Sequence, residues 1–203
     1  MDDDLTGHQF PIIALACSAG GLDAVTRILA ALPQQLPAAI IVLQHLEPTG
    51  PDMLAGILGR RTALPVRTAA DGDRLAAGRV WVAPRGHHTL VTAELSIALV
   101  ESGAIPPHRP SADLLLTTLA LAAGPWAVAV VLTGGGIDAA TGATVIHRFG
   151  GTVLVASPET SAVASMPQAA INRDSITDQV VALDDLAGLL CALAAADPLT
   201  PPH

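Results

Sequence analysis

The chain has no lysine and no tyrosine, and aromatic residues make up only 2% of it. A nucleic-acid-binding protein normally carries a stripe of Lys and Arg that neutralises phosphates. Here ten basic residues, all arginines, stand against 18 acidic ones, which gives a formal net charge of −8. The scarcity of aromatic rings also argues against stacking platforms for bases. We therefore expect no nucleic-acid partner.

Long apolar runs and closely spaced cysteines are lacking as well. No uninterrupted apolar stretch reaches the roughly 18 residues that are needed to cross a bilayer, so we expect no direct membrane insertion. The first four residues, MDDD, are acidic where a signal peptide would be basic. Cys17 and Cys191 lie far apart in the sequence and do not suggest a disulfide framework. These features predict a cytoplasmic location.

Aliphatic residues are abundant, since 51% of the chain is hydrophobic and only 14% is charged. Short continuous apolar runs alternate with stretches of helical periodicity. This alternation predicts an α/β fold with a doubly wound, mainly parallel sheet covered by helices on both faces. Residues 89–91 and 96–100 are predicted to form a short antiparallel hairpin. We expect one domain over residues 11–196, between an N-terminal extension (1–10) and a C-terminal tail (197–203).

The other predicted elements follow the same patterns. Strands are expected at 11–16, 38–44, 66–68, 79–83, 126–132 and 152–156. Helices are expected at 22–32, 51–60, 111–123, 138–149, 168–173 and 184–196. Ser111 is the expected N-cap of the third helix.

Three of the predicted strands are followed by residues that can carry out acyl transfer. Ser18 follows the first strand, His45 follows the second, and Asp138 follows the strand at 126–132. Because ligands bind at the carboxyl ends of the strands in such sheets, we expect these side chains to converge, with Ser18 Oγ within hydrogen-bond reach of His45. In such a trio the serine attacks, the histidine takes its proton, and the aspartate orients the ring.

Each residue of this trio also has a simpler interpretation. Ser18 would be an ordinary helix N-cap, and Asp138 would cap the helix that begins beside it. His45 would be a hydrogen-bonded loop residue. Cys17 is a rival nucleophile, although a cysteine at a strand end is usually a small buried hydrophobe. Gly20 and Gly21 favour the catalytic interpretation, because N–H groups at the start of a helix can receive an oxyanion.

Metal and dinucleotide sites are the alternatives to this trio. His87 and His88 would point apart on a strand, and His147 has no second ligand one turn away, so we expect no metal site. Residues 134–139 (GGGIDA) fit the G-x-G-x-x-A dinucleotide fingerprint. An aspartate within that loop would repel a pyrophosphate, however. We expect no cofactor.

Five segments occur in an order that is typical of one family. They are SAGG (18–21), QHL (44–46), RPSAD (109–113), LTGGGID (132–138) and MPQAA (166–170). With them the chain resembles the catalytic domain of CheB, the bacterial chemotaxis receptor methylesterase, over roughly residues 11–193.

The resemblance implies a serine hydrolase without a cofactor. Such an enzyme removes methyl groups from glutamate methyl esters on the cytoplasmic helices of chemoreceptors and deamidates certain receptor glutamines. By resemblance Ser18 is the nucleophile, His45 the base and Asp138 the orienting acid. Further oxyanion or substrate-site candidates are Ala19, Gly20, Gly21, Gly134, Gly135, Gly136 and Arg109.

The chain departs from the family pattern beside the site. The family usually has threonine at the position of Ala19, methionine at that of Gly135 and glycine at that of Ala139. Family members also commonly carry an N-terminal receiver domain, whereas about ten residues precede the first strand here. We therefore expect activity without phosphorylation, with control left to expression level or to a separate chain. The alternative function is a non-catalytic α/β binding module for a protein partner or a nucleotide.

Overall fold

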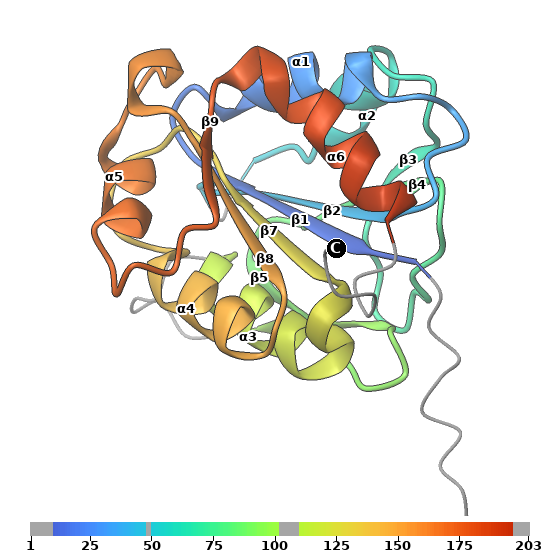
Figure 1. Cartoon of the computed structure of the whole chain (residues 1–203). Helices are drawn as coiled ribbons and strands as arrows, with labels where there is room; N and C mark the ends of the chain where they lie inside the picture. The colour runs from blue at the N-terminus through green and yellow to red at the C-terminus, as the bar shows by residue number, and fades with distance from the viewer. Residues whose placement is uncertain (1–9, 48–49, 102–109, 197–203) are drawn as a thin grey trace, which may run out of the picture.

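A seven-stranded, wholly parallel sheet runs through the protein in the computed structural model, which describes residues 10–47, 50–101 and 110–196 (Figure 1). Its strands are β1 (Ile12–Cys17), β2 (Ala39–Gln44), β3 (Val66–Thr68), β4 (Arg79–Val82), β7 (Ala127–Val131), β8 (Thr152–Ala156) and β9 (Gln179–Val181). Their order across the sheet is β3-β4-β2-β1-β7-β8-β9. All the pairings are parallel.

Helices cover both faces of this sheet, as Figure 1 shows. One face carries α1 (Gly21–Ala31), α2 (Leu54–Gly59) and α6 (Leu186–Ala195). The other carries α3 (Ala112–Ala123), α4 (Ala140–Arg148) and α5 (Ser165–Ile171). A separate antiparallel hairpin, β5 (His87–Val91) with β6 (Ile97–Glu101), packs against α3. Short 3-10 turns lie at Gly124–Trp126, Pro158–Thr160 and Leu183–Asp185. The predicted doubly wound α/β fold is confirmed.

Strand β1 is buried along its whole length because both of its faces are covered. Its alternate residues therefore enter two different cores. Ile12, Ala14 and Ala16 pack on the side of α3 and α4, whereas Ile13, Leu15 and Cys17 pack on the side of α1 and α6. This two-sided burial explains why the strand is a continuous apolar run.

The strands before and after the hairpin are added on opposite sides of β1. The next strand in sequence, β2, lies on one side of β1, and β7 lies on its other side. In open α/β sheets such a switch point leaves a crevice at the carboxyl ends of the strands. The loops after β1, β2 and β7 meet there, and these loops carry the predicted trio.

The predicted elements match the structure with ends that differ by up to three residues, and three differences bear on the argument. Strand β9 was not predicted, because it has only three residues and Gln179 and Val180 are exposed. Helix α5 begins at Ser165 rather than at Gln168. Helix α4 begins at Ala140, so Asp138 lies in the preceding loop and not in the helix.

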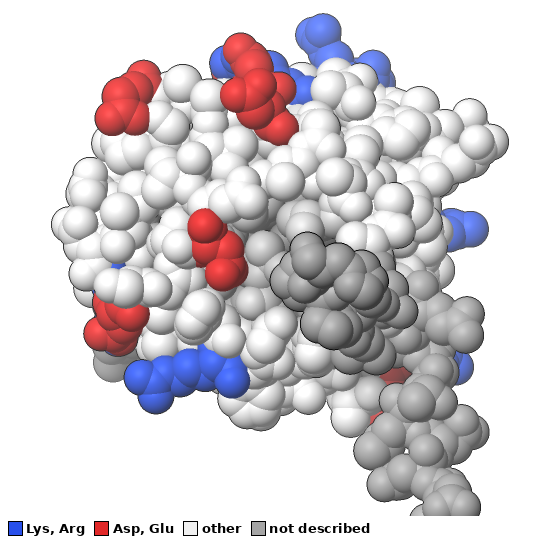
Figure 2. All heavy atoms as spheres, in the orientation of Figure 1, with Lys and Arg blue, Asp and Glu red and all other residues white. Residues whose placement is uncertain are grey.

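No helix among the described residues is long and apolar enough to cross a membrane. On the face shown in Figure 2, the described arginines and acidic residues lie singly or in small groups on a mostly uncharged surface. They do not form a continuous basic stripe on that face.

Candidate active site

Backbone hydrogen bonds connect the loop after β1 with the loops after β2 and β7. The pairing of β1 and β2 continues past their ends, where the His45 N–H donates to the Cys17 carbonyl at 2.9 Å. The Ser18 N–H donates to the Thr133 carbonyl after β7, also at 2.9 Å. Ser18 and His45 therefore lie on the same edge of the sheet, as the sequence predicted.

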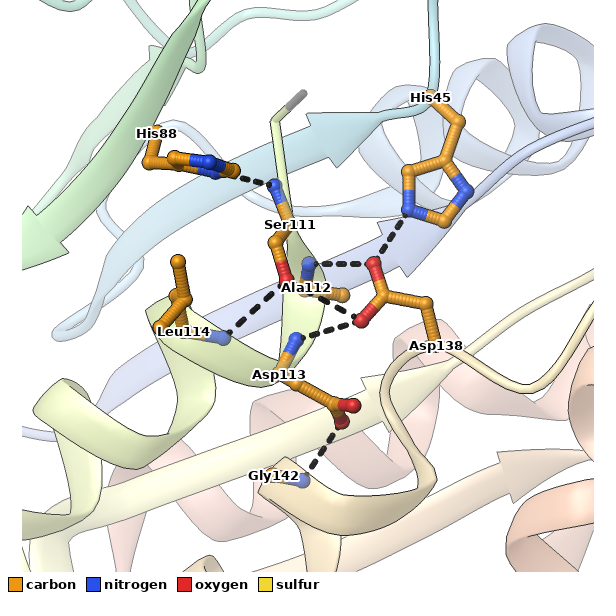
Figure 3. Close-up of polar contacts among 8 residues, drawn as sticks. All are labelled: His45, His88, Ser111, Ala112, Asp113, Leu114, Asp138 and Gly142. Atoms are coloured by element: carbon orange, nitrogen blue, oxygen red, sulfur yellow. Dashed lines mark hydrogen bonds and ion pairs between the residues drawn. The ribbon is translucent and has the colours of Figure 1, made fainter. Parts of the chain in front are cut away.

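His45 and Asp138 are in direct contact, as Figure 3 shows. Nε2 of His45 lies 2.7 Å from Oδ2 of Asp138, and both side chains are only 11% exposed. A hydrogen bond to a carboxylate that is this well shielded from water is stronger than one on the surface. The structure thus brings together two members of the predicted trio from loops 93 residues apart.

The Asp138 carboxylate also accepts hydrogen bonds from the start of α3 (Figure 3). Its Oδ2 accepts from Ala112 N at 2.7 Å, and its Oδ1 accepts from Asp113 N at 2.9 Å and from Ser111 Oγ at 3.3 Å. Burial alone would raise the pKa of Asp138, but the hydrogen bonds from His45, Asp113 N and Ala112 N outweigh it and lower the pKa to about 2. Asp138 is therefore a carboxylate at neutral pH.

Two of the simpler interpretations of the trio change with the structure. Asp138 does cap a helix, but that helix is α3 and not the following helix α4, whose N-cap residue Ala139 makes no side-chain cap. Ser18 is not the N-cap of α1, because Gly20 holds that position without a side-chain hydrogen bond.

Ser111 is the N-cap of α3, as predicted, and its Oγ accepts from Leu114 N at 3.4 Å. Its backbone N–H donates to Nδ1 of His88, which is buried on β5. His87 is half-buried and lies 3.6 Å from a Glu101 carboxylate oxygen instead. The two adjacent histidines thus point apart, as predicted.

Ser18 and His45 line a cavity of about 760 Å³ between α1 and α2. Its other lining residues are Ala19, Gly20, Leu22, Asp23, Thr26, Gln44, Ile57 and Arg61. The shared cavity gives a substrate access to both side chains at once. A direct hydrogen bond between Ser18 Oγ and the His45 ring stays a prediction.

Close backbone packing around Ser18 requires glycine at three of the predicted positions. A Cβ on Gly134 would lie 2.8 Å from Ser18 Cβ and 2.5 Å from Met166 Sδ. A Cβ on Gly21 would lie 2.4 Å from Cys17 Sγ, and Gly20 has a φ of +79°. By contrast, a Cβ on Gly135 or Gly136 would meet nothing within 4 Å.

Several backbone N–H groups near Ser18 are already engaged. Those of Ser18, Gly21 and Gly134 donate to the carbonyls of Thr133, Ser18 and Val163. The N–H groups of Ala19, Gly20, Gly135 and Gly136 have no such acceptor among the described residues. An oxyanion requires donors that are free to point at it, so these four positions are the better candidates.

Cys17 is fully buried on the α1 side of the sheet. Burial raises the pKa of its thiol to about 12. Because the thiolate is the nucleophilic form, Cys17 does not compete with Ser18 at neutral pH.

Some site residues fall outside the predictions or outside the described residues. Arg109 lies outside the described residues. The sequence singled out Gln44 only as part of a motif, yet it lines the cavity, and its buried Oε1 has no hydrogen-bond partner among the described residues. Asp113 was also missed as a site residue, although an aspartate in the first turn of a capped helix signals a structured terminus. In the described ranges no group of three or more His, Cys, Asp or Glu side chains could hold a metal ion.

Comparison with known proteins shows which family the chain belongs to. Residues 13–190 match the family described as CheB methylesterase. The chain is 37% identical over 179 residues to protein-glutamate methylesterase/protein-glutamine glutaminase 3 of Geobacter sulfurreducens, with 87% of this chain and 48% of that protein covered. It is 38% identical over 188 residues to the protein of Moorella thermoacetica named protein-glutamate methylesterase/protein-glutamine glutaminase, with 90% of this chain and 44% of that protein covered.

A solved structure is similar over nearly the whole chain. The crystal structure of the Thermotoga maritima CheB methylesterase catalytic domain has a TM-score of 0.87 and 31% sequence identity, with 92% of this chain and 100% of that one covered. The chain spans about half the length of the curated relatives that it matches. On the residues matched and on this fold, the chain belongs to the CheB methylesterase family.

Proposed function

We propose that this protein is a serine esterase that hydrolyses glutamate methyl esters on chemoreceptor proteins and deamidates receptor glutamines at the same site. The observation that carries the proposal is the 2.7 Å contact between His45 Nε2 and the buried Asp138 carboxylate, beside a cavity that Ser18 also lines. The relatives are named as protein-glutamate methylesterases and glutaminases, which supports this substrate class. None of these names supports the alternative of a non-catalytic binding module.

In the proposed reaction, Ser18 Oγ attacks the carbonyl carbon of the ester while His45 accepts the hydroxyl proton. Asp138 stabilises the imidazolium that forms, because it is already a carboxylate held in place by α3. When the tetrahedral intermediate collapses, the methoxy group takes the proton from His45 and leaves as methanol. Water then hydrolyses the acyl-enzyme through the same relay and releases the glutamate carboxylate. With a glutamine substrate the first leaving group is ammonia.

The oxyanion of the tetrahedral intermediate needs backbone donors close to Ser18. We assign this role to the N–H groups of Ala19 and Gly135. Ala19 directly follows the nucleophile, a position that supplies an oxyanion donor in other serine hydrolases, and neither N–H donates to a backbone carbonyl among the described residues. Gly20, Gly21, Gly134 and Gly136 would shape the surrounding backbone.

The proposed partners are the methylated cytoplasmic helices of chemoreceptors, and the proposed location is the cytoplasm. The family acts in chemotaxis, which supports receptor partners in general. Activity without phosphorylation, with control by expression level or by a separate chain, stays a prediction.

The test is methanol release from methylated receptor membranes by wild-type protein, Ser18→Ala and Cys17→Ala. Ser18→Ala should abolish turnover without unfolding the protein, and so should His45→Ala. Cys17→Ala, one residue from the nucleophile, should retain activity because the thiol is buried and protonated. Asp138→Asn should leave residual activity, with a loss of about 10⁴-fold, the size that the corresponding change causes in a serine protease. Undiminished release by Ser18→Ala would contradict the proposal.

A further inference from the structure

We infer that Asp113 is a positioning residue for the proposed triad, because it holds the backbone on which Asp138 is mounted. This inference rests on the proposed function only for its activity measurement. Asp113 lies in the first turn of α3, and its side chain points toward the start of α4 (Figure 3). Its Oδ1 accepts from Gly142 N, in the first turn of α4, at 2.7 Å.

The two aspartates form a reciprocal arrangement between neighbouring helices. Asp138, from the loop before α4, caps the first turn of α3, and Asp113, from α3, accepts from the first turn of α4. Helix α4 needs this outside acceptor, because Ala139 at its N-cap position offers no side-chain hydrogen bond. The first N–H groups of a helix have no partner within the helix itself.

The backbone directly after Asp138 is strained, at the start of the helix whose first turn Asp113 contacts. Gly136 has a φ of +87° and Ala139 a φ of +84°, so left-handed residues flank the segment that carries Asp138. This conformation is unfavourable for alanine and persists only where surrounding contacts enforce it. The Gly142 N–H, three residues after Ala139, donates to Asp113 Oδ1 at 2.7 Å. Asp113 therefore holds the first turn of α4, which begins two residues after Asp138.

The packing of α3 on α4 gives this tether a fixed geometry. A Cβ on Gly142 would lie 2.6 Å from Leu116 Cβ and 3.0 Å from Asp113 Cα, so the two helices approach closely at this glycine. Burial, with a contribution from the nearby Asp138 carboxylate, raises the pKa of Asp113, whereas the N–H groups of Gly142 and Ala139 oppose that rise. The surroundings of Asp113 therefore disfavour its negative charge. This agrees with a role in which Asp113 acts as a hydrogen-bond acceptor for Gly142 N rather than as a charge.

The proposal attributes the role of Asp113 to its acceptor oxygen and not to its charge. Asp113→Asn keeps an acceptor for Gly142 N and should retain the site, whereas Asp113→Ala removes the acceptor and should displace Asp138. The matched control is Asp178→Ala, which deletes another aspartate–backbone hydrogen bond, from Val153 N at 2.6 Å. Asp178 lies at the opposite end of the sheet, beside the start of β8.

Two measurements test this difference. The first is the rate at which a fluorophosphonate labels Ser18, which reports activation of the serine whatever the natural substrate is. We expect a loss of about 10²-fold in Asp113→Ala, the size that a 1 Å misplacement can cause, and rates within about threefold of wild type in Asp113→Asn and Asp178→Ala. The second is the downfield NMR resonance of the His45 Nε2 proton, assigned with His45→Ala. It should be lost or shifted in Asp113→Ala alone.

The outcomes separate this inference from the proposed function. A wild type that is labelled but releases no methanol contradicts the proposed substrate and leaves the Asp113 comparison intact. If the wild type is not labelled at all, the inference is tested by the His45 Nε2 proton resonance, which should still be lost or shifted in Asp113→Ala alone. The inference would be overturned if Asp113→Ala kept both the labelling rate and the His45 proton resonance of the wild type. It would also be overturned if Asp113→Asn lost as much labelling as Asp113→Ala. If Asp113→Ala does not fold, Asp113→Glu moves the acceptor by one methylene, and wild-type behaviour of that variant would overturn it as well.

Discussion

His45 faces Asp138 through Nε2 and not through Nδ1. In the serine-protease template, the aspartate holds Nδ1–H and the serine lies against Nε2. Here the contact with the carboxylate uses the other nitrogen, so Nδ1 is the ring atom that we expect to accept the Ser18 proton. The acid and base roles of the two nitrogens are thus exchanged relative to that template.

The first prediction concerns the tautomer of His45. Because the carboxylate accepts a hydrogen bond, the neutral ring should carry its proton on Nε2. ¹⁵N NMR of the imidazole at a pH where the ring is neutral should therefore show an Nε2–H, Nδ1-basic ring. Asp138→Asn should weaken this preference. A neutral ring that carries its proton on Nδ1 in the wild type would contradict the contact.

A second prediction compares two adjacent glycines. Gly134→Ala should reduce Ser18 labelling by at least about 10-fold, because its Cβ would collide with Ser18 Cβ and Met166 Sδ. Gly135→Ala should keep labelling within about threefold, since its Cβ enters open space and its N–H remains. The measurement is the labelling rate of each variant, with circular dichroism as the check on folding. Equal effects of the two substitutions would show that steric contact with Ser18 is not the cause.

A third prediction concerns acid stability. The pKa of Asp138 is lowered from 3.8 to about 2 in the folded protein. A carboxyl group whose pKa is lower in the folded protein than in the unfolded chain stabilises the folded state at pH values above its unfolded pKa. For Asp138 this stabilisation is lost as the pH falls from about 4 through about 2. The expected contribution at neutral pH is about 2 kcal/mol. Urea unfolding from pH 7 to pH 2 should show this loss in wild type and a smaller one in Asp138→Asn; parallel curves would contradict it.

A fourth prediction uses the opposite pKa shift of Asp113. Because its pKa is raised, its ionised form lowers stability above the folded pKa. Asp113→Asn should therefore raise the midpoint of thermal unfolding at pH 7, and the gain should disappear as the pH falls from the folded pKa of Asp113 to the unfolded value of 3.8. A variant that is less stable than wild type at pH 7 would show that the carboxylate stabilises the fold through its charge.

A fifth prediction concerns the buried thiol. With its pKa raised to about 12, Cys17 should react slowly with iodoacetamide at pH 7 in the folded protein and rapidly in denaturant. Cys191, which is only partly buried, provides the internal comparison. Mass spectrometry of both peptides measures the two rates. Fast alkylation of Cys17 in the folded state, with loss of activity, would restore it as a candidate nucleophile.

The loop around Asp138 shows where prediction from sequence stopped. The pattern at 138–149 predicted a helix, and Asp138 as its cap was one of the alternatives. In the structure α4 begins at Ala140, and Asp138 caps α3 instead. Sequence periodicity cannot reveal this, because the partner N–H groups lie 25 and 26 residues away and are brought close only by helix packing.

The sequence by itself determined the alternation of strands and helices and the positions of Ser18 and His45 at strand ends. It could do so because a parallel strand buried on both faces must be a continuous apolar run. Only the tertiary structure decided which helix Asp138 caps, which nitrogen of His45 it meets, and why Gly134 has no side chain. Those features depend on distances between segments far apart in the chain, and such distances are set by how α3, α4 and the sheet pack together.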